Sequence, residues 1–414
     1  MNIRLEPSLL FGEKTIRVPG SKSETNRLLL LRALYPELQI ENMSDSDDSD
    51  AMRTALIGND HIDVGHAGTA MRFLTAFFAI QRGRTVTITG SARMKQRPIK
   101  ILVDALRTLG AEITYLEDEG YPPLRIVGRD LISDQVSLAA DVSSQYISAL
   151  LLIAPKLPNG LKILLTGIVT SRPYINMTLS LLKQIGAECS FEDREISVSP
   201  LHNVNRETVI IVESDWSAAS YFYSIVALSP VGSSLRLQNF RSESFQGDIK
   251  IIKIYKLFGV QSSFDNGVLQ IRKKGVQLTK IELDCNDTPD IAQTIVVTCF
   301  GLGISCHLTG LHTLVIKETD RLHALKTEIT KLGGKAEITY NSIYLYPASH
   351  CNQEVVINSY DDHRMAMAFA TLGVKVAINI ADAEVVSKSY PAFWQDIAQL
   401  GLLKPESLTD TIQS

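Results

Sequence analysis

The sequence predicts an α/β protein of two lobes, each built from three related units around buried helices. Two observations lead to this prediction: apolar helical segments recur at a nearly constant spacing, and helices that end at glycine recur at a similar spacing between them. A chain of 414 residues has room for two or three domains. The repeated spacing therefore divides the chain into units of similar build.

The first buried helix is predicted within residues 18–34, which read VPGSKSETNRLLLLRAL. A Pro-Gly pair interrupts the preceding strand, and Ser21 followed by Glu24 forms a capping box at the helix start. Leucines cover every face of the helix, which is typical of burial. Its first turn nevertheless carries polar residues that suit an anion, because a helix N-terminus also offers unpaired N–H groups and partial positive charge. These residues are Lys22, Ser23 and Arg27.

Five further apolar helices are predicted to start with small or polar residues. The six expected starts lie near Ser23, Gly68, Ser143, Ser217, Asp290 and His363. From the second start onward the spacing is 73 to 75 residues, whereas the first gap is only 45 residues. We therefore expect six related units, one of which is shortened between Asp50 and Gly65.

A second series of amphipathic helices is predicted to end at glycine and to lead into strands. The glycines are Gly110, Gly186, Gly259 and Gly333, at spacings of 76, 73 and 74 residues. Glycine suits this place because it adopts the left-handed conformation that commonly ends a helix. Any α/β protein alternates helices and strands. However, glycine recurs at each of these helix ends and the two series of helices share one period, which favours a true repeat.

Six buried helices divide naturally into two groups of three. We therefore expect one lobe of residues 20–213 and a second lobe formed by residues 1–19 together with residues 214–414. The acidic run from Asp45 to Asp50 is expected to be a solvated loop.

The overall composition excludes several classes of function. The chain has 41 basic and 45 acidic residues and a net charge of −4, so it is not expected to bind nucleic acid or an acidic membrane. Its five cysteines form no CxxC pair and are expected to be reduced thiols. The N-terminal residues do not resemble a signal peptide, and no apolar run is long enough to span a membrane. We expect a soluble cytoplasmic monomer.

Basic residues cluster at predicted helix starts and in turns, where they need an anionic partner. They are Lys22, Arg27, Arg72, Arg93, Lys95, Arg97, Lys317, Arg321, Arg364 and Lys388. A single Arg or Lys is most often only a surface charge, so the argument rests on the set. Asp290 and Glu318 stand at helix starts, where a carboxylate could equally be a simple cap.

The motifs that would indicate other chemistry are missing from the sequence. No HExxH or related histidine spacing occurs, so we expect no zinc site. The chain also contains no Walker-type loop and no GxGxxG, which argues against a nucleoside triphosphate and a dinucleotide.

Five motifs in this chain resemble those of the 5-enolpyruvylshikimate-3-phosphate synthase family. They are PGSKS with Asn26-Arg27, AGTAMR at 67–72, RMKQRP at 93–98, KETDRL at 317–322 and DHRMAM at 362–367. Each motif alone is weak evidence, but all five occur in the right order over more than 340 residues.

The resemblance implies a two-lobed enolpyruvyl transferase fold, in which each lobe has three βαβαββ units and the active site lies in the cleft between the lobes. It implies transfer of the enolpyruvyl group of phosphoenolpyruvate to the 5-hydroxyl of shikimate 3-phosphate, with release of phosphate and without a metal or organic cofactor. This reaction belongs to chorismate and aromatic amino-acid biosynthesis and is the target of glyphosate.

Site residues follow from the resemblance position by position. The expected shikimate 3-phosphate site is Ser23, Arg27, Ser143, Ser144, Ser171, Tyr174, Asp290 and Lys317. The expected phosphoenolpyruvate site is Lys22, Gly68, Arg97, Gln145, Arg321, Arg364 and Lys388. Asp290 is expected to be the base at the hydroxyl, while Lys22 and Glu318 exchange protons at the enolpyruvyl carbons.

The chain departs from the common family pattern at several positions. His66 stands where many members have Asn, Phe73 where Pro is common, and Thr313 where some members have an Asn that contacts the acceptor. The segment between Asp50 and Gly65 is shorter than usual. We leave Thr313 out of the expected site.

Two alternative functions remain open at this point. The related UDP-N-acetylglucosamine enolpyruvyl transferases share the fold and the donor, but they usually have Asn after the first-helix Lys and often a Cys in the loop that reads Ser91 to Arg97 here. A non-catalytic phosphometabolite-binding protein is the second alternative. It would not need Lys22, Asp290 and Glu318, and all three are present.

Overall fold

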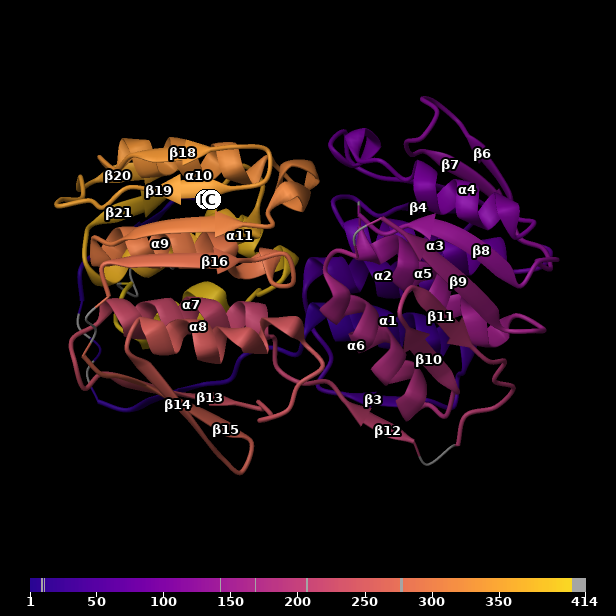
Figure 1. The fold of residues 1–414 in the computed structure, drawn as a ribbon, viewed down its shortest axis with the longest axis horizontal. Helices are drawn as coiled ribbons and strands as arrows, with labels where there is room; N and C mark the ends of the chain where they lie inside the picture. Colours follow the sequence, from indigo (N-terminus) through magenta and orange to yellow (C-terminus); the bar gives the residue numbers. More distant parts are fainter. Residues whose placement is uncertain are drawn as a thin grey trace. The chain divides into compact units, whose positions relative to one another are not determined.

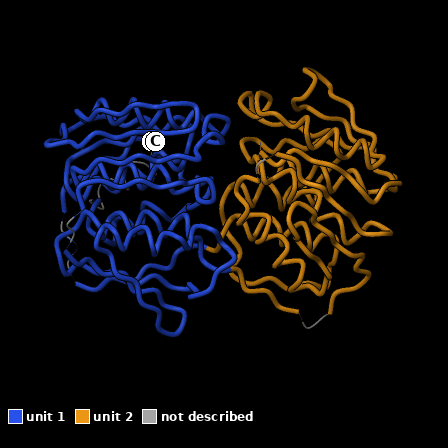
Figure 2. The backbone as a smooth tube through the Cα atoms, in the orientation of Figure 1, with its two compact units in different colours: residues 1–19, 213–414 blue, residues 20–212 orange. Residues whose placement is uncertain are grey.

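The computed structural model describes residues 1–403, except residues 9, 11, 142, 168, 206, 207, 276 and 277. The chain divides into unit 1, which comprises residues 1–19 and 213–414, and unit 2, which comprises residues 20–212 (Figure 2). The second crossing falls between Val212 and Glu213, one residue before the expected position. Residues 404–414 of the expected second lobe lie outside the described residues.

Two four-stranded sheets of unit 2 have the same strand order (Figure 1). In each, two parallel strands are followed by an antiparallel hairpin that pairs with the second of them. The first sheet is β4 (His61–Asp63), β5 (Thr85–Thr89), β7 (Leu124–Val127) and β6 (Glu112–Tyr115). The second is β8 (Gln135–Ala139), β9 (Leu161–Thr166), β11 (Glu195–Val198) and β10 (Cys189–Glu192). A parallel pair is formed by β3 (Gln39–Glu41) and β12 (Val209–Ile211).

Unit 1 repeats this strand order in two more sheets. One is β2 (Lys14–Ile16), β13 (Ser234–Gln238), β15 (Val268–Lys273) and β14 (Val260–Asp265). The other is β16 (Lys280–Asp284), β17 (Ser305–Thr309), β19 (Ile343–Leu345) and β18 (Ala336–Ile338). A three-stranded sheet contains β1 (Ile3–Leu5), β21 (Ile378–Ile380) and β20 (Val355–Ile357). The N-terminal strands of the chain thus complete sheets whose other strands come from residues after 213.

All six predicted buried helices are confirmed, and each begins within two residues of its expected start. Unit 2 contains α1 (Lys22–Leu34), α3 (Gly68–Ala79) and α5 (Ser144–Ile153). Unit 1 contains α7 (Trp216–Leu228), α9 (Ala292–Leu302) and α11 (His363–Ala370). The predicted cap of α1 is also confirmed, since Ser21 Oγ accepts the N–H of Glu24 at 3.4 Å.

The four predicted glycine stops are confirmed as well. They follow α4 (Lys100–Thr108), α6 (Arg172–Gln184), α8 (Ile251–Leu257) and α10 (Arg321–Lys331). Gly110, Gly186, Gly259 and Gly333 have φ values of 109°, 96°, 76° and 87°. A residue with a Cβ rarely adopts this conformation, which explains why glycine recurs there. The last described helix, α12 (Phe393–Gln399), follows the strands of the last sheet.

Short 3₁₀ helices connect several of these elements. They are η1 (Met94–Gln96), η2 (Ala154–Lys156), η3 (Gly247–Lys250), η4 (Pro289–Ile291), η5 (His312–Ile316), η6 (Thr371–Val374) and η7 (Ala383–Lys388). Two expected site residues lie in these short helices, Asp290 in η4 and Lys388 in η7.

The expectation for the acidic run was wrong. Residues from Asp47 onward form α2 (Asp47–Ile57), and Asp48 is buried with only 7% of its surface exposed. Acidic residues in a first helical turn are favoured by the helix dipole. The run is therefore the start of a helix rather than a solvated loop.

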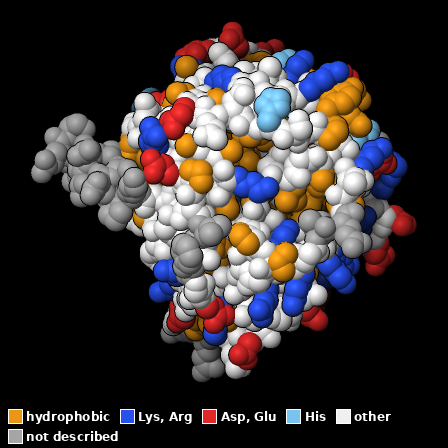
Figure 3. Space-filling view, turned by 90° about the vertical axis from the view of Figure 1, so that its left-hand side faces the viewer, with side chains coloured by type: hydrophobic (Ala, Val, Ile, Leu, Met, Phe, Trp, Pro, Cys, Tyr) orange, Lys and Arg blue, Asp and Glu red, His pale blue; other side chains and the backbone are white. Residues whose placement is uncertain are grey.

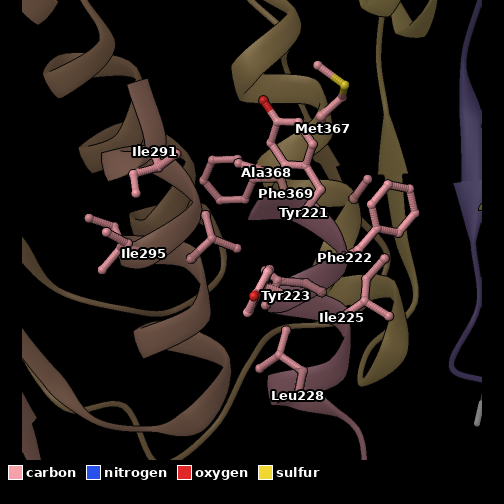
Figure 4. Close-up of a cluster of buried hydrophobic side chains, with 14 of the residues drawn as sticks. Tyr221, Phe222, Tyr223, Ile225, Leu228, Ile291, Ile295, Met367, Ala368 and Phe369 are labelled. Carbon is pink, nitrogen blue, oxygen red and sulfur yellow. The ribbon is translucent and has the colours of Figure 1, made fainter. Parts of the chain in front are cut away.

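Aromatic and aliphatic side chains join the three buried helices of unit 1. Figure 4 shows Tyr221 and Phe222 of α7 near Phe369 of α11, with Ile295 of α9 facing the same cluster. Hydroxyl pairs add polar links inside this core, since Ser220 of α7 lies 3.0 Å from Thr294 of α9. Buried polar groups that are all paired fix one arrangement of the helices.

Hydrogen bonds hold both crossing segments within unit 1. Ser214 Oγ donates to the carbonyl of Val18 at 2.7 Å, and the Asp215 N–H donates to the carbonyl of Pro19 at 3.0 Å. The side chain of Asp215 also caps α7 by accepting the N–H of Ala218 at 2.8 Å. The crossings are therefore tied to the start of a buried helix.

The surface carries mixed charge. Figure 3 shows one face of the molecule, on which basic and acidic side chains occur among apolar ones. In the described part of the chain, none of the helices combines the length and apolar character needed to cross a membrane.

Candidate active site

Unit 1 brings five expected site residues into one cluster of charges. Asp290, in η4 before α9, is the centre of this cluster and is 9% exposed. Its Oδ1 lies 3.3 Å from Arg321 Nη1 and 3.8 Å from Lys317 Nζ, and its Oδ2 lies 3.3 Å from Arg364 Nη2. Three cations thus surround one buried carboxylate.

Arg321 holds both carboxylates that are expected to transfer protons. Its Nη1 contacts Asp290, and its Nη2 donates to Glu318 Oε2 at 2.8 Å. Nε donates to Oδ2 of the fully buried Asp362 at 2.7 Å. Burial alone would lower the pKa of Arg321, but Asp362 and Glu318 outweigh it and raise that pKa. Arg321 therefore remains a fixed cation between three acids.

The remaining cations of unit 1 approach the same region from α11 and η7. Arg364 Nη1 donates to the backbone carbonyl of Asp290 at 3.2 Å, which fixes the guanidinium beside η4. Lys388 Nζ donates to the carbonyl of Asp361 at 2.5 Å. Arg364 and Lys388 are thus both held by backbone oxygens at the start of a helix.

A further buried acid, Asp248 in η3, lies close enough to Asp290 to feel its charge. Burial, followed by the charge of Asp290, raises the pKa of Asp248 to about 7. Ser217 Oγ donates a hydrogen bond to Asp248 Oδ2. Asp248 thus links the start of α7 to the cluster.

In unit 2, Lys22 in the first turn of α1 forms a shielded ion pair. Its Nζ lies 3.0 Å from Oδ2 of Asp48 in α2, and the side chains of Lys22 and Asp48 are 12% and 9% exposed. The pair holds the Lys22 ammonium at a helix N-terminus, where N–H groups and a cation can receive an anion together.

Arg27 of α1 is buried among neutral oxygen atoms. It donates to Thr178 Oγ1 at 2.8 Å, to the Ser23 carbonyl at 2.8 Å, and to the Tyr174 carbonyl at 3.3 Å. Burial lowers the pKa of Arg27 to about 10, so the guanidinium still carries its charge at neutral pH. Because these partners are neutral, Arg27 contributes a positive potential around Ser23 and Tyr174.

Gly68 and Arg97 form a second candidate site for an anion in unit 2. Arg97 packs directly on Gly68, since a Cβ on residue 68 would lie 2.5 Å from Arg97 Nη1. Arg97 is 7% exposed, and within the described residues its Nε has no hydrogen-bond partner. A buried guanidinium with an unsatisfied donor at the first residue of α3 is suited to an anionic ligand.

Arg72 fixes the loop that carries Arg97. Its Nη1 donates to the Gly68 carbonyl at 3.2 Å, and its Nη2 donates to the Pro98 carbonyl at 2.9 Å. Tyr146 of α5 donates to the same Pro98 oxygen at 2.6 Å. Arg72 is thus a positioning residue between the start of α3 and the loop.

The expected hydroxyl and amide donors lie at the starts of α5 and α6. Ser143 caps α5 by accepting the Gln145 N–H at 3.3 Å, and Gln145 Nε2 donates to Thr69 Oγ1 of α3 at 3.2 Å. Ser144 begins α5 and is buried. Ser171 precedes α6 in a left-handed conformation with φ of 51°. Backbone strain at a residue other than glycine is typical of ligand-binding turns.

Comparison with known proteins decides the family. The family model of EPSP synthase (3-phosphoshikimate 1-carboxyvinyltransferase) matches residues 54–397. The chain belongs to the EPSP synthase family. It is 47% identical over 393 residues to a 3-phosphoshikimate 1-carboxyvinyltransferase of Bacteroides fragilis, covering 94% of this chain and 95% of that protein. The resemblance drawn from the motifs is thus confirmed.

Other family members show the same full-length correspondence. A 3-phosphoshikimate 1-carboxyvinyltransferase of Photobacterium damsela is 35% identical, with 96% of this chain and 99% of that protein covered. The crystal structure of the EPSP synthase of Acinetobacter baumannii matches with a TM-score of 0.76 at 22% identity, covering 97% of this chain and 98% of that one. The predicted fold class is therefore confirmed.

The departures from the common EPSP synthase pattern have identifiable contacts. His66 Nδ1 lies 3.1 Å from Ser91 Oγ in the loop before Arg97. Phe73 is fully buried, and the guanidinium of Arg27 lies 5.3 Å from its ring centroid, so Phe73 supports Arg27 by a cation–π contact. Thr313 is 7% exposed, and among the described residues its Oγ1 has no hydrogen-bond partner.

The structure groups the expected site residues in each unit and adds others that sequence reasoning missed. The additions are Asp48, Asp248 and Asp362. Asp362 lies inside a quoted motif, and the buried cations Lys22 and Arg321 required acidic partners, which was the available signal for Asp48 and Asp362. Arg72 was already among the predicted basic residues, and the structure shows it bound to the Gly68 and Pro98 carbonyls. Within the described residues, no group of three or more His, Cys, Asp or Glu side chains is placed to hold a metal ion.

Proposed function

We propose that this protein transfers the 1-carboxyvinyl group of phosphoenolpyruvate to the 5-hydroxyl of shikimate 3-phosphate and releases phosphate. The observation that carries the proposal is the placement of Asp290 and Glu318 on the two terminal nitrogens of Arg321. Two carboxylates fixed side by side on one buried cation provide proton-transfer groups next to an anion-binding centre. Membership of the EPSP synthase family supports the assignment.

The proposed acceptor and donor sites use different chemistry. The shikimate 3-phosphate site comprises Ser23, Arg27, Ser143, Ser144, Ser171, Tyr174, Asp290 and Lys317. The phosphoenolpyruvate site comprises Lys22, Gly68, Arg97, Gln145, Arg321, Arg364 and Lys388. Hydroxyl groups suit a polyhydroxylated ring, whereas guanidinium forks suit phosphate and carboxylate oxygens.

In the proposed mechanism, Asp290 takes the proton of the 5-hydroxyl as that oxygen attacks the enolpyruvyl carbon. The methylene carbon gains a proton, and a tetrahedral intermediate forms. This intermediate then loses a proton from the resulting methyl group and expels phosphate. Lys22 and Glu318 share these proton transfers, and Lys22 also stabilises the charge of the departing phosphate.

These residues belong to two units, so the proposed reaction requires the units to close on the substrates. Phosphoenolpyruvate would take ligands from both units, and closure would exclude water from the reacting carbons. The segments around Gly20 and Glu213 act as the hinge in this proposal.

The proposal includes the setting in which the enzyme works. It acts as a cytoplasmic monomer in chorismate biosynthesis and is a target of glyphosate. Size-exclusion chromatography coupled to light scattering tests whether the enzyme is a monomer. An assay of phosphate release with glyphosate tests whether it is a target, because glyphosate should then inhibit in competition with phosphoenolpyruvate.

The decisive experiment measures phosphate release from phosphoenolpyruvate with each acceptor separately. Release with shikimate 3-phosphate supports the proposal. Release only with UDP-N-acetylglucosamine would assign the chain to the related transferases instead. Binding of shikimate 3-phosphate without release of phosphate would indicate a binding protein, and the enzymatic proposal would then be wrong.

Glu318→Gln is expected to slow turnover by about 10²-fold with nearly unchanged KM values. The glutamine can still accept a hydrogen bond from Arg321, but it cannot exchange a proton with substrate. Steady-state kinetics of phosphate release measure the effect. Glu282→Gln is the matched control, because Glu282 pairs with Lys280 at exposed positions of β16. An unchanged kcat in the Glu318 variant would remove this residue from the mechanism.

Gly68→Ala is expected to raise KM for phosphoenolpyruvate by about tenfold and to leave KM for shikimate 3-phosphate unchanged. The added methyl group would displace the guanidinium of Arg97 from the start of α3. Gly275→Ala is the control, since a Cβ there meets no atom of the described residues within 4 Å. Equal KM values for wild type and Gly68→Ala would contradict the proposed contact of Arg97 with the donor.

A further inference from the structure

The turn before α11 has an unusual backbone. Tyr360 and Asp361 are consecutive residues with φ values of 57° and 53°. L-residues other than glycine rarely adopt this left-handed conformation, and a bulky residue such as tyrosine does so less readily than aspartate. Two such residues in succession persist only where surrounding contacts hold them, which is typical of ligand-binding turns.

This turn contacts two of the cations that unit 1 contributes to the proposed phosphoenolpyruvate site, and it caps the helix that carries the third, Arg364. The carbonyl of Asp361 accepts Lys388 Nζ at 2.5 Å. The carboxylate of Asp362 accepts Arg321 Nε at 2.7 Å and the backbone N–H of Arg364 at 2.9 Å. The directions of Lys388 and Arg321, and the backbone position of Arg364, therefore depend on the conformation of residues 361 and 362.

A second contact holds the turn from the side of α10. Tyr360 Oη donates to Glu328 Oε1 at 2.5 Å, and Lys331 Nζ donates to the same oxygen at 2.8 Å. Glu328 is fully buried in α10. A hydrogen bond from a phenol to a buried carboxylate paired with a lysine is short and charge-assisted, and such bonds are among the stronger ones in proteins.

Glu328 lies seven residues after Arg321 on α10, so both side chains project from the same helical face two turns apart. Arg321 binds Asp362, and Glu328 binds Tyr360. The helix thus holds the turn at residues 360 and 362, on either side of the carbonyl that contacts Lys388. Loss of the Tyr360 contact would leave residue 361 fixed at one end only.

We propose that Tyr360 is a positioning residue for donor binding: its hydroxyl, held by Glu328, keeps the strained turn in the conformation that aims Lys388, Arg321 and Arg364 at phosphoenolpyruvate. This inference rests on the proposed function. It assigns a role to a residue that contacts no substrate. Burial, followed by the hydrogen bond to Glu328, raises the pKa of Tyr360 to about 12, so the hydroxyl retains its proton as a donor near neutral pH.

Tyr360→Phe removes the hydroxyl and little else. We expect KM for phosphoenolpyruvate to rise by about tenfold, because the three cations lose their common support. KM for shikimate 3-phosphate is expected to change by less than about twofold, since its proposed ligands lie chiefly in unit 2. A merely structural role would instead lower the melting temperature or affect both KM values equally.

Two further variants make the test specific. Tyr346→Phe is the matched control, because Tyr346 Oη donates to Glu337 Oε1 at 3.0 Å in an exposed pair of the same unit. We expect it to behave as wild type. Glu328→Gln retains an oxygen that can accept the Tyr360 hydroxyl, so its effect on KM for phosphoenolpyruvate should be smaller than that of Tyr360→Phe.

The outcomes separate this inference from the proposed function. An active wild type with unchanged KM for phosphoenolpyruvate in Tyr360→Phe would overturn the inference alone. A wild type that releases no phosphate would contradict the proposed function. In that case, calorimetric titration of wild type and Tyr360→Phe with phosphoenolpyruvate would test the inference by itself. Weaker binding by Tyr360→Phe than by wild type would support the inference. Equal binding, or no binding by either protein, would overturn it.

Discussion

Asp290→Asn is expected to reduce the kcat of phosphate release by about 10³-fold, within the range seen for loss of a general base. The amide preserves the size of the side chain but cannot accept the proton of the attacking hydroxyl. Arg321 retains Glu318 and Asp362 as partners, so the cluster should keep its arrangement. KM values are therefore expected to change much less than kcat.

The control for this prediction is Asp287→Asn, three residues earlier in the chain. Asp287 forms an exposed ion pair with Lys250 at 2.6 Å, so its neutralisation should leave kcat unchanged. Melting temperatures of both variants measure any loss of folding. A kcat of Asp290→Asn within threefold of wild type would show that another group accepts the proton. Asp248, the buried acid whose pKa the charge of Asp290 raises, would be the first candidate.

Local sequence signals predicted the helices because the features that start and end a helix lie within a few residues of its ends. The capping box at Ser21 and the glycines that end α4, α6, α8 and α10 act through residues within one helical turn. Apolar faces that recur every 73 to 75 residues also identify buried helices without knowledge of their partners. These signals therefore placed each buried helix within two residues.

Local signals misjudged Asp48 for the same reason. A run of acidic residues is usually solvated, and only the position of α1 beside α2 buries this one against Lys22, 26 residues earlier in the chain. The expected burial of Lys22 in an apolar helix did require a carboxylate, but sequence alone does not identify which of several neighbouring acids supplies it.

The backbone of the turn at Tyr360 shows a second limit. Aspartate tolerates a left-handed conformation, but no sequence pattern predicts it for tyrosine. Contacts made by α10, more than 30 residues away in the sequence, impose it. The family motif located Arg364 and Asp362, whereas the means by which they are oriented became visible only in three dimensions.

Arg97→Ala is expected to lower kcat/KM for phosphoenolpyruvate by about 10³-fold, because a buried guanidinium can form two charge-assisted hydrogen bonds to one anion. Arg97 is suited to this role because Arg72 and Tyr146 already fix the adjacent Pro98 carbonyl. Its own Nε has no hydrogen-bond partner among the described residues. A ligand that reaches Nε would thus gain a donor that no described protein group has to release.

Arg97→Lys refines this prediction, because lysine keeps the charge but not the planar fork. It should recover only part of the lost kcat/KM, whereas full recovery would show that charge alone binds the donor. Arg125→Ala, at an exposed position of β7, is the control and should match wild type. Should Arg97→Ala instead raise KM for shikimate 3-phosphate and leave phosphoenolpyruvate unaffected, Arg97 would belong to the acceptor site, and the anion at the start of α3 would be the acceptor phosphate.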